Sequence, residues 1–152
     1  MKKKYLIVIA DYYKEISIGL LKSAQKIIPK SNSVKIIKVP GVFEIPVTIS
    51  KNIRKFDAFI ALGCVIKGQT PHFDFISQAS TNAIMDLSIK NKKPIGNGII
   101  TCLNMKQAIE RKKKAQKQLV LLFLYCHKNE NSFQPKEKSK SNYYSKTIRE
   151  VL

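Results

Sequence analysis

The chain alternates short apolar runs with longer segments in which apolar residues recur every three or four positions. Short, bounded apolar runs are typical of strands buried on both faces, and the longer pattern is typical of helices. Strands are predicted at residues 5–10, 33–39, 58–65 and 95–101. Helices are predicted at residues 15–28, 45–54, 72–89 and from 105 onward. Because strands that alternate with helices are joined by right-handed crossovers, this order predicts a parallel sheet.

The predicted fold is a three-layer α/β/α sandwich around a flavodoxin-like, parallel four-stranded sheet. Such sheets bind ligands in the crevice outside the carboxyl ends of their strands. The loops at residues 11–14, 40–44 and 66–72 should meet there, with a fourth near 97–101. The helix residues expected to face the sheet are Ile16, Leu20, Ala24 and Ile27, and then Phe75, Ala79, Ile84 and Leu87.

Composition bounds the class of protein. A chain of 152 residues with 44% apolar residues suits one domain with a substantial core. The net charge of +18 is carried mainly by lysine and is compatible with binding to nucleic acid or an anionic surface. We favour a lysine-rich solvated surface, because basic residues are spread along the whole sequence and aromatic residues do not alternate with them. No specific nucleic-acid partner is therefore expected.

The cysteines and the apolar runs indicate a reduced, cytoplasmic protein. Cys64, Cys102 and Cys126 are odd in number and widely spaced, which favours neither a disulfide framework nor a zinc site. The apolar run at residues 5–10 is too short for a signal peptide, and the run at 119–126 is too short to cross a bilayer. No phosphate-binding loop, dinucleotide fingerprint or metal-ligand pair is present, so no cofactor or metal is expected.

The segment at residues 61–74 is the strongest candidate for chemistry. Gly68 is expected to permit a backbone conformation that a side chain would block. Thr70 is expected to cap a helix with Pro71 in its first position, which puts His72 in the first turn. A helix start attracts anions, and an imidazole beside it is suited to general acid/base catalysis. The alternative is that His72 is an ordinary polar residue at a helix start.

Three other residues fit a ligand at the same edge. Glu44 follows a Pro40–Gly41 turn and could accept hydrogen bonds from hydroxyl groups, or it could cap the next helix with Phe43 in the core. Tyr12 could stack on a planar heterocycle or pack at the sheet edge. The guanidinium of Arg111 suits a phosphate dianion, although a solvated basic run is the default interpretation of its lysine neighbours.

Four ordered segments resemble one known family. They are GVFEIP at residues 41–46, ALGCVIKGQTPHFD at 61–74, NGIIT at 97–101 and QAIER at 107–111. Together they resemble the 6,7-dimethyl-8-ribityllumazine synthases, and the resemblance covers residues 5 to about 111. It implies a transferase of riboflavin biosynthesis that condenses 5-amino-6-(ribitylamino)uracil with 3,4-dihydroxy-2-butanone 4-phosphate, with loss of phosphate and two waters.

The resemblance also implies the roles of individual residues. Tyr12 would stack on the pyrimidine, while Val42, Phe43 and Glu44 would hold the ribityl chain and the ring. The backbone of Cys64, Val65 and Ile66 would line the ring's edge. Gln69 and Thr70 would bind the butanone phosphate, and His72 would move protons. Asn97 and Arg111 would come from a neighbouring subunit, so the resemblance implies a homopentamer, with a decamer or an icosahedral shell as open alternatives.

The resemblance ends after Arg111. The family's Asn-Lys-Gly turn and alanine-rich helix are replaced by a lysine run and an apolar segment, followed from residue 126 by a polar tail expected to be disordered. We hypothesise that a frameshift in a lysine-rich stretch changed this terminus. Residues 1–125 are taken as the domain and 126–152 as the tail. A basic nucleic-acid-binding module that uses this tail and a shell-forming scaffold without turnover are the alternative functions.

Overall fold

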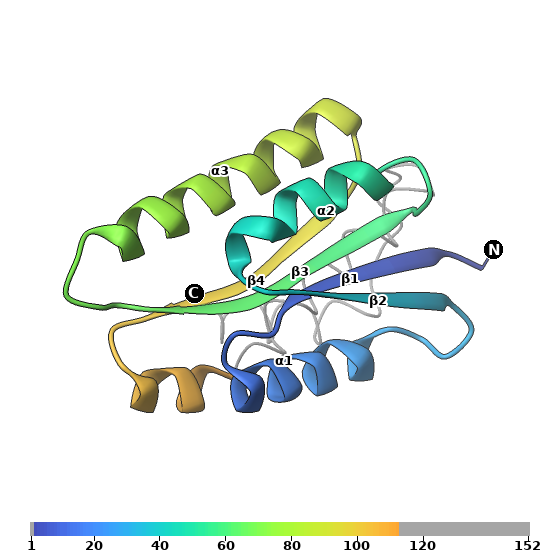
Figure 1. Ribbon diagram of the computed structural model, residues 1–152. Coiled ribbons are helices and arrows are strands. Elements are labelled where there is room, and N and C mark those ends of the chain that lie inside the picture. Colours follow the sequence, from blue (N-terminus) through green and yellow to red (C-terminus); the bar gives the residue numbers. More distant parts are fainter. Residues whose placement is uncertain (1, 113–152) are drawn as a thin grey trace, which may run out of the picture.

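The computed structural model describes residues 2–112, and they form the four-stranded parallel sheet that the sequence predicts (Figure 1). The strands lie in the order β2-β1-β3-β4, and every neighbouring pair is parallel. Their bounds are Lys4–Ala10 for β1, Ser33–Val39 for β2, Ala58–Ile66 for β3 and Ile95–Cys102 for β4. Each predicted strand is confirmed to within one residue at either end.

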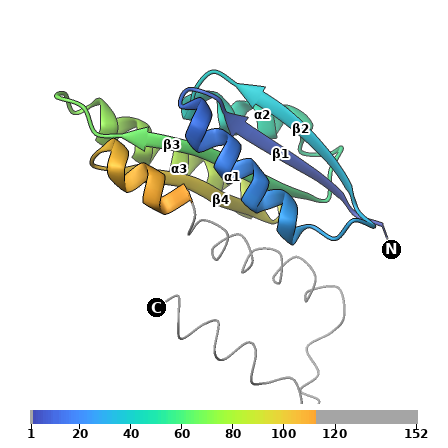
Figure 2. The same cartoon turned by 90° about the horizontal axis from the view of Figure 1, so that it is seen from below.

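Helices cover both faces of the sheet, as expected for a three-layer sandwich (Figure 1). The short 3-10 helix η1 (Val42–Glu44), α2 (Ile45–Asn52) and α3 (His72–Asn91) lie on one face. The other face carries α1 (Lys14–Ile27) and a helix whose described part spans residues 105–112. Figure 2 shows these last two helices in front of the sheet.

Two apolar clusters hold the layers together. Under α1, the side chains of Ile16, Leu20 and Ala24 pack against alternate residues of β1 and β3, as their spacing predicts. Under α2 and α3, Ile45, Ile49 and Ile84 pack against the opposite set of strand residues. Because β1 and β3 are central, both of their faces are buried, which explains their continuous apolar sequences.

The predicted inward face of α3 is wrong in part. Phe75 is 68% exposed and Ala79 is also exposed, whereas Ser80 and Ile84 are the buried residues of this helix. The face toward the sheet follows Ile76, Ser80, Ile84 and Leu87. The apolar residues of α3 form no single stripe, so the sequence could not select the correct side.

Several predictions for the terminus lie outside the described residues. These are the apolar segment at 119–126, the polar tail at 126–152, the frameshift and the domain end at 125. Within residues 2–112, none of the helices combines the length and the apolar character that crossing a bilayer requires.

The C-terminus of α3 offers a direct stability test. Lys92 has φ 51° and ψ 36°, the left-handed conformation, and the N–H of Lys93 donates to the Ser88 carbonyl at 3.1 Å. A side chain in this conformation costs about 1 kcal/mol, and glycine is favoured there. Lys92→Gly is therefore expected to raise the free energy of unfolding by about 0.5 kcal/mol, measured by urea denaturation.

The control for this test lies within the same helix. Gln78→Gly replaces an exposed residue in its interior, and it should lower the free energy of unfolding by about 1 kcal/mol. A loss of stability in both variants would contradict the assigned helix end.

Candidate functional site

A cleft of about 660 Å³ opens at the carboxyl edge of the sheet, where the sequence places its ligand site. It is formed by the turn between β1 and α1, by the segment around η1, by the end of β3 and by the start of α3. The lining residues are Tyr12, Tyr13, Gly41, Val42, Phe43, Glu44, Cys64, Val65, Ile66, Gly68, Thr70, His72, Phe73 and Ile76.

Nine of the twelve predicted site residues line this one cleft. They are Tyr12, Val42, Phe43, Glu44, Cys64, Val65, Ile66, Thr70 and His72. The remaining three, Gln69, Asn97 and Arg111, do not line it. Three segments far apart in the sequence, at residues 12–13, 41–44 and 64–76, thus supply one site, because parallel strands bring their carboxyl ends to the same edge.

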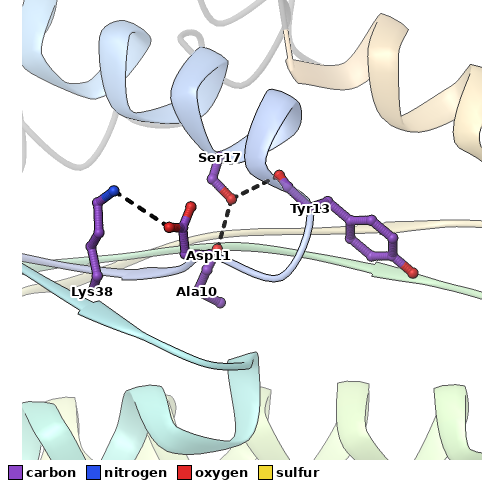
Figure 3. Close-up of polar contacts among 5 residues, drawn as sticks. All are labelled: Ala10, Asp11, Tyr13, Ser17 and Lys38. Carbon is purple, nitrogen blue, oxygen red and sulfur yellow. Dashed lines mark hydrogen bonds and ion pairs between the residues drawn. The ribbon is translucent and has the colours of Figure 1, made fainter.

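The turn after β1 presents an exposed aromatic ring to the cleft. The buried Ser17 hydroxyl lies 2.8 Å from the Ala10 carbonyl and 2.9 Å from the Tyr13 carbonyl, and it can donate to either (Figure 3). This contact fastens the first turn of α1 to the end of β1. The Tyr12 ring is 74% exposed and meets the Tyr13 ring edge to face, with their centroids 4.9 Å apart. Tyr12 is therefore available for stacking on a planar ligand.

Asp11, in the same turn, does not line the cleft. Its carboxylate pairs with the Lys38 ammonium at 3.4 Å (Figure 3). Its N–H donates to the Val39 carbonyl. The Tyr13 ring extends away from this ion pair. The negative charge of Asp11 is thus paired with a lysine on β2.

The structural alternative predicted for Glu44 and Phe43 is wrong in both of its parts. A Glu44 carboxylate oxygen accepts the Gly41 N–H at 3.0 Å, so this side chain caps its own 3-10 turn rather than the following helix. The Phe43 ring is 60% exposed and does not lie in the core. One carboxylate oxygen thus holds the Glu44 side chain in place, and both Glu44 and Phe43 line the cleft.

The end of β3 supplies the apolar floor of the cleft. Burial raises the pKa of the Cys64 thiol to about 12, and the neighbouring Cys102 thiol acts in the same direction. Cys64 is therefore a neutral thiol at physiological pH rather than a nucleophilic thiolate. Burial also raises the pKa of the Tyr13 hydroxyl, with the Tyr12 hydroxyl as the next cause. Neither group adds charge to the cleft near neutral pH.

The loop before α3 differs from the prediction in two details. The helix begins at His72 as expected, but Pro71 occupies the N-cap and no side chain caps it, so Thr70 does not have the predicted role. Gly68 has no positive φ, and a Cβ at this position would meet nothing within 4 Å. The fold therefore does not require a glycine at position 68.

The start of α3 leaves polar groups facing the cleft. The N–H groups of Asp74 and Phe75 donate to the Pro71 carbonyl, at 3.0 and 3.3 Å. The N–H groups of the two preceding residues, His72 and Phe73, lie at the helix start, where they have no acceptor within the helix. Both residues line the cleft, and the His72 side chain is exposed. Together these groups suit an anion next to an imidazole.

The three residues outside the cleft are partly engaged elsewhere. Asn97 is exposed on the edge strand β4, and its side-chain oxygen accepts the Ile99 N–H at 3.0 Å. Arg111 is exposed, and its guanidinium donates to the Thr101 carbonyl at 3.2 Å. Gln69 is exposed in the loop before α3. Because Arg111 does not reach the cleft, no lysine or arginine among the described residues lines it.

Three large side chains that line the cleft, those of Tyr13, Phe73 and Ile76, are not among the residues predicted from the sequence. Tyr13 adjoins the predicted Tyr12, but which of two consecutive aromatic residues faces a ligand depends on how the turn bends. Phe73 and Ile76 lie on the first two turns of α3, and the correct face of that helix could not be selected from the sequence.

Comparison with known proteins identifies the family. The family model for 6,7-dimethyl-8-ribityllumazine synthase matches residues 2–120. The 6,7-dimethyl-8-ribityllumazine synthase of Bartonella tribocorum is 44% identical over 123 residues, which cover 77% of this chain and 82% of the relative. The 6,7-dimethyl-8-ribityllumazine synthase of Agrobacterium fabrum is 36% identical over 126 residues, which cover 77% of this chain and 85% of the relative. The matches extend past Arg111, where the motifs end, and the chain belongs to the 6,7-dimethyl-8-ribityllumazine synthase family.

Proposed function

We propose that this chain is a 6,7-dimethyl-8-ribityllumazine synthase that condenses 5-amino-6-(ribitylamino)uracil with 3,4-dihydroxy-2-butanone 4-phosphate in riboflavin biosynthesis. Family membership supports the reaction. The single observation that carries the site is that nine residues with expected roles line one cleft. The cleft holds aromatic, carboxylate and imidazole groups, which are the types that a pyrimidine, a polyol chain and a proton transfer require.

The aromatic and carboxylate end of the cleft suits the ribitylaminouracil. The exposed rings of Tyr12 and Phe43 are free to stack on the pyrimidine. Glu44, fixed by its bond from Gly41, has a second oxygen to accept a ribityl hydroxyl proton. The backbone at Cys64–Ile66 offers peptide groups to the edge of the ring, since these residues end β3 at the cleft.

The butanone phosphate is proposed to bind at the start of α3. Gln69 and Thr70 lie in the loop before it, and the helix start favours a phosphate. Among residues 2–112, however, no lysine or arginine lines the cleft to balance a dianion. We therefore propose that Arg111 and Asn97 reach the cleft from a second copy of the chain, so that each site is complete only in an oligomer.

Two surface features support this assembly. The apolar side chains of Phe75, Met85 and Ile89 on α3 are more than half exposed. A second hollow, of about 420 Å³, continues from the cleft between α2 and α3, and the buried Ser80 hydroxyl beside it has no partner among the described residues. A second copy would cover both, and we propose a homopentamer, with a decamer or an icosahedral shell left open.

His72 is proposed as the general acid/base. The substrate amine attacks the butanone carbonyl, and water leaves as the imine forms. Phosphate is then eliminated, and ring closure releases a second water. Imine formation and ring closure move protons at nitrogen and oxygen, and elimination of phosphate removes a proton from the carbon next to the imine. His72 lies beside the helix start proposed for the phosphate, where it can exchange these protons. Holding both substrates together accounts for the rest of the acceleration.

Replacing His72 tests this role. In an absorbance assay of lumazine formation from the two substrates, His72→Ala should lower kcat about tenfold, with little change in either KM. The loss is modest because the condensation proceeds without a catalyst and the cleft still positions both molecules. His127→Ala, which removes the only other histidine, is the control and should retain wild-type kinetics. Equal kinetics in the two variants would remove the assigned role.

We also propose that the enzyme works in the reducing cytoplasm. This rests on the odd number of widely spaced cysteines, of which Cys64 and Cys102 are free thiols.

A further inference from the structure

The edge of the sheet opposite the cleft is built from four segments that meet there. The Lys3 carbonyl accepts the Ser33 N–H at 2.9 Å, which joins the start of β1 to the loop before β2. The Asp57 N–H donates to the Lys4 carbonyl at 2.9 Å, which joins the loop before β3. The Phe59 N–H donates to the Pro94 carbonyl at 3.0 Å, which joins the loop before β4. These contacts form one continuous edge.

Each of the four segments places an exposed cation on this edge. We define the amino-edge patch as the exposed residues Lys2, Lys4, Lys30, Arg54, Lys55 and Lys92. The half-buried Lys3 and Lys93 add two further ammonium groups beside it. The only carboxylate in these four segments is that of Asp57, and it accepts the Lys4 N–H at 2.7 Å.

Charge on the cleft side of the molecule is nearly balanced. The basic residues in the segments that adjoin the carboxyl ends of the strands are Lys14, Lys38, Lys67, Lys106, Arg111 and Lys112. The acidic residues there are Asp11, Glu15, Glu44, Asp74 and Glu110. Ion pairs link Lys38 to Asp11 and Lys112 to Glu15. Within residues 2–112, folding thus gathers cations at the amino edge and leaves the carboxyl edge nearly balanced.

We propose that the amino-edge patch binds the phosphodiester backbone of double-stranded nucleic acid, without reading its sequence. Four strands spaced about 4.8 Å apart give the patch a width of roughly 15 Å. A duplex carries one phosphate charge per about 1.7 Å of its axis with both strands counted, so a length of duplex equal to this width carries about nine phosphates, of which only those on the near side face the patch. Six exposed cations across such a width can displace several counterions at once.

The chemistry of the patch favours a duplex over other polyanions. Single strands are bound by stacking bases on exposed aromatic rings, whereas Phe56 is half-buried against Phe59 and Tyr5 is buried. Bilayer surfaces are bound by amphipathic helices, whereas this patch consists of loops and a strand start. Lysine ammonium groups on loops contact phosphate without the bidentate geometry that identifies a base.

The test compares two full-length variants with the same change in net charge. The edge variant carries Lys2→Gln, Lys30→Gln, Lys55→Gln and Lys92→Asn, with asparagine at the last position because it tolerates a positive φ. The control variant carries Lys14→Gln, Lys22→Gln, Lys35→Gln and Lys106→Gln, at exposed positions outside the patch. Fluorescence anisotropy with a labelled 20-base-pair duplex of random sequence measures affinity at several salt concentrations, on samples matched for assembly state by gel filtration.

The wild type should bind, and the edge variant should lose at least about tenfold in affinity at 100 mM salt. The slope of log affinity against log salt should become shallower by about 3 to 4 in the edge variant, and the control should change less than about threefold in affinity. Equal losses in both variants, or no loss in the edge variant, would overturn the proposal. The proposal would also be overturned if the wild type does not bind the duplex, even if it binds vesicles that contain anionic lipid. Unchanged lumazine formation by the edge variant would show that its fold is intact.

Discussion

Arg111→Ala is expected to raise the KM for the butanone phosphate about a hundredfold and to leave the KM for the ribitylaminouracil nearly unchanged. No lysine or arginine of the described part of the chain lines the cleft, so removing this guanidinium would leave a phosphate dianion without a partner of that kind. A charge-assisted hydrogen bond to a buried anion contributes about 2–3 kcal/mol, which corresponds to this change in KM. Initial rates measured while each substrate is varied in turn provide the check.

Two controls separate this role from a general effect of charge. Lys106→Ala removes a cation from an exposed position of the same helix and should leave both KM values unchanged. Arg111→Lys retains the charge but loses the bidentate geometry, and it should recover part of the affinity. A KM for the butanone phosphate that rises equally in Arg111→Ala and Lys106→Ala would contradict a specific phosphate contact.

Mixing two variants that are each impaired tests whether Arg111 acts on a neighbouring chain. If a Glu44→Gln chain is unfolded and refolded together with an Arg111→Ala chain, about a quarter of the interfaces will combine an intact cleft with an intact arginine. Activity should then exceed that of either variant alone. Activity that stays at the level of the separate variants would place the arginine in its own chain's site.

The strand pattern was predictable because it depends on local sequence. β1 and β3 are buried on both faces, so their runs of apolar residues could not belong to solvated loops. Once four parallel strands were expected, the loops at their carboxyl ends had to share one edge, and the cleft followed. Glu44 and His72 were found in this way, from their positions after a strand and at a helix start.

Features that depend on tertiary packing could not be predicted in the same way. Phe75 and Ile76 are adjacent in sequence, yet one is exposed and the other turns toward the sheet, because neighbouring helices and strands determine the rotation of α3. The amino-edge patch was hidden for a related reason. Its cations come from four separate segments, each of which looks like an ordinary lysine-bearing loop.

Gly63 in β3 connects the core to the cleft, and Gly63→Ala should disturb both. A Cβ at this position would lie 2.6 Å from a Val42 methyl carbon and 3.2 Å from the Ala10 Cβ. Val42 is buried and belongs to η1, so relief of the overlap must move the turn that carries Phe43 and Glu44. Overpacking of this kind costs about 1–3 kcal/mol, and a shift of the site by a fraction of an ångström lowers kcat/KM about tenfold or more.

Thermal denaturation and lumazine assays on three variants make this test specific. Gly68→Ala adds the same methyl group where nothing lies within 4 Å, so it should leave the melting temperature unchanged. Val42→Ala alone removes buried volume and should destabilise the fold, but combined with Gly63→Ala it removes the closest contact. The double variant should therefore be more stable than the sum of the two single changes predicts, by about 1 kcal/mol or more. Additive losses would show that the strand, rather than η1, absorbs the extra methyl group, and would break the proposed link between the core and the cleft.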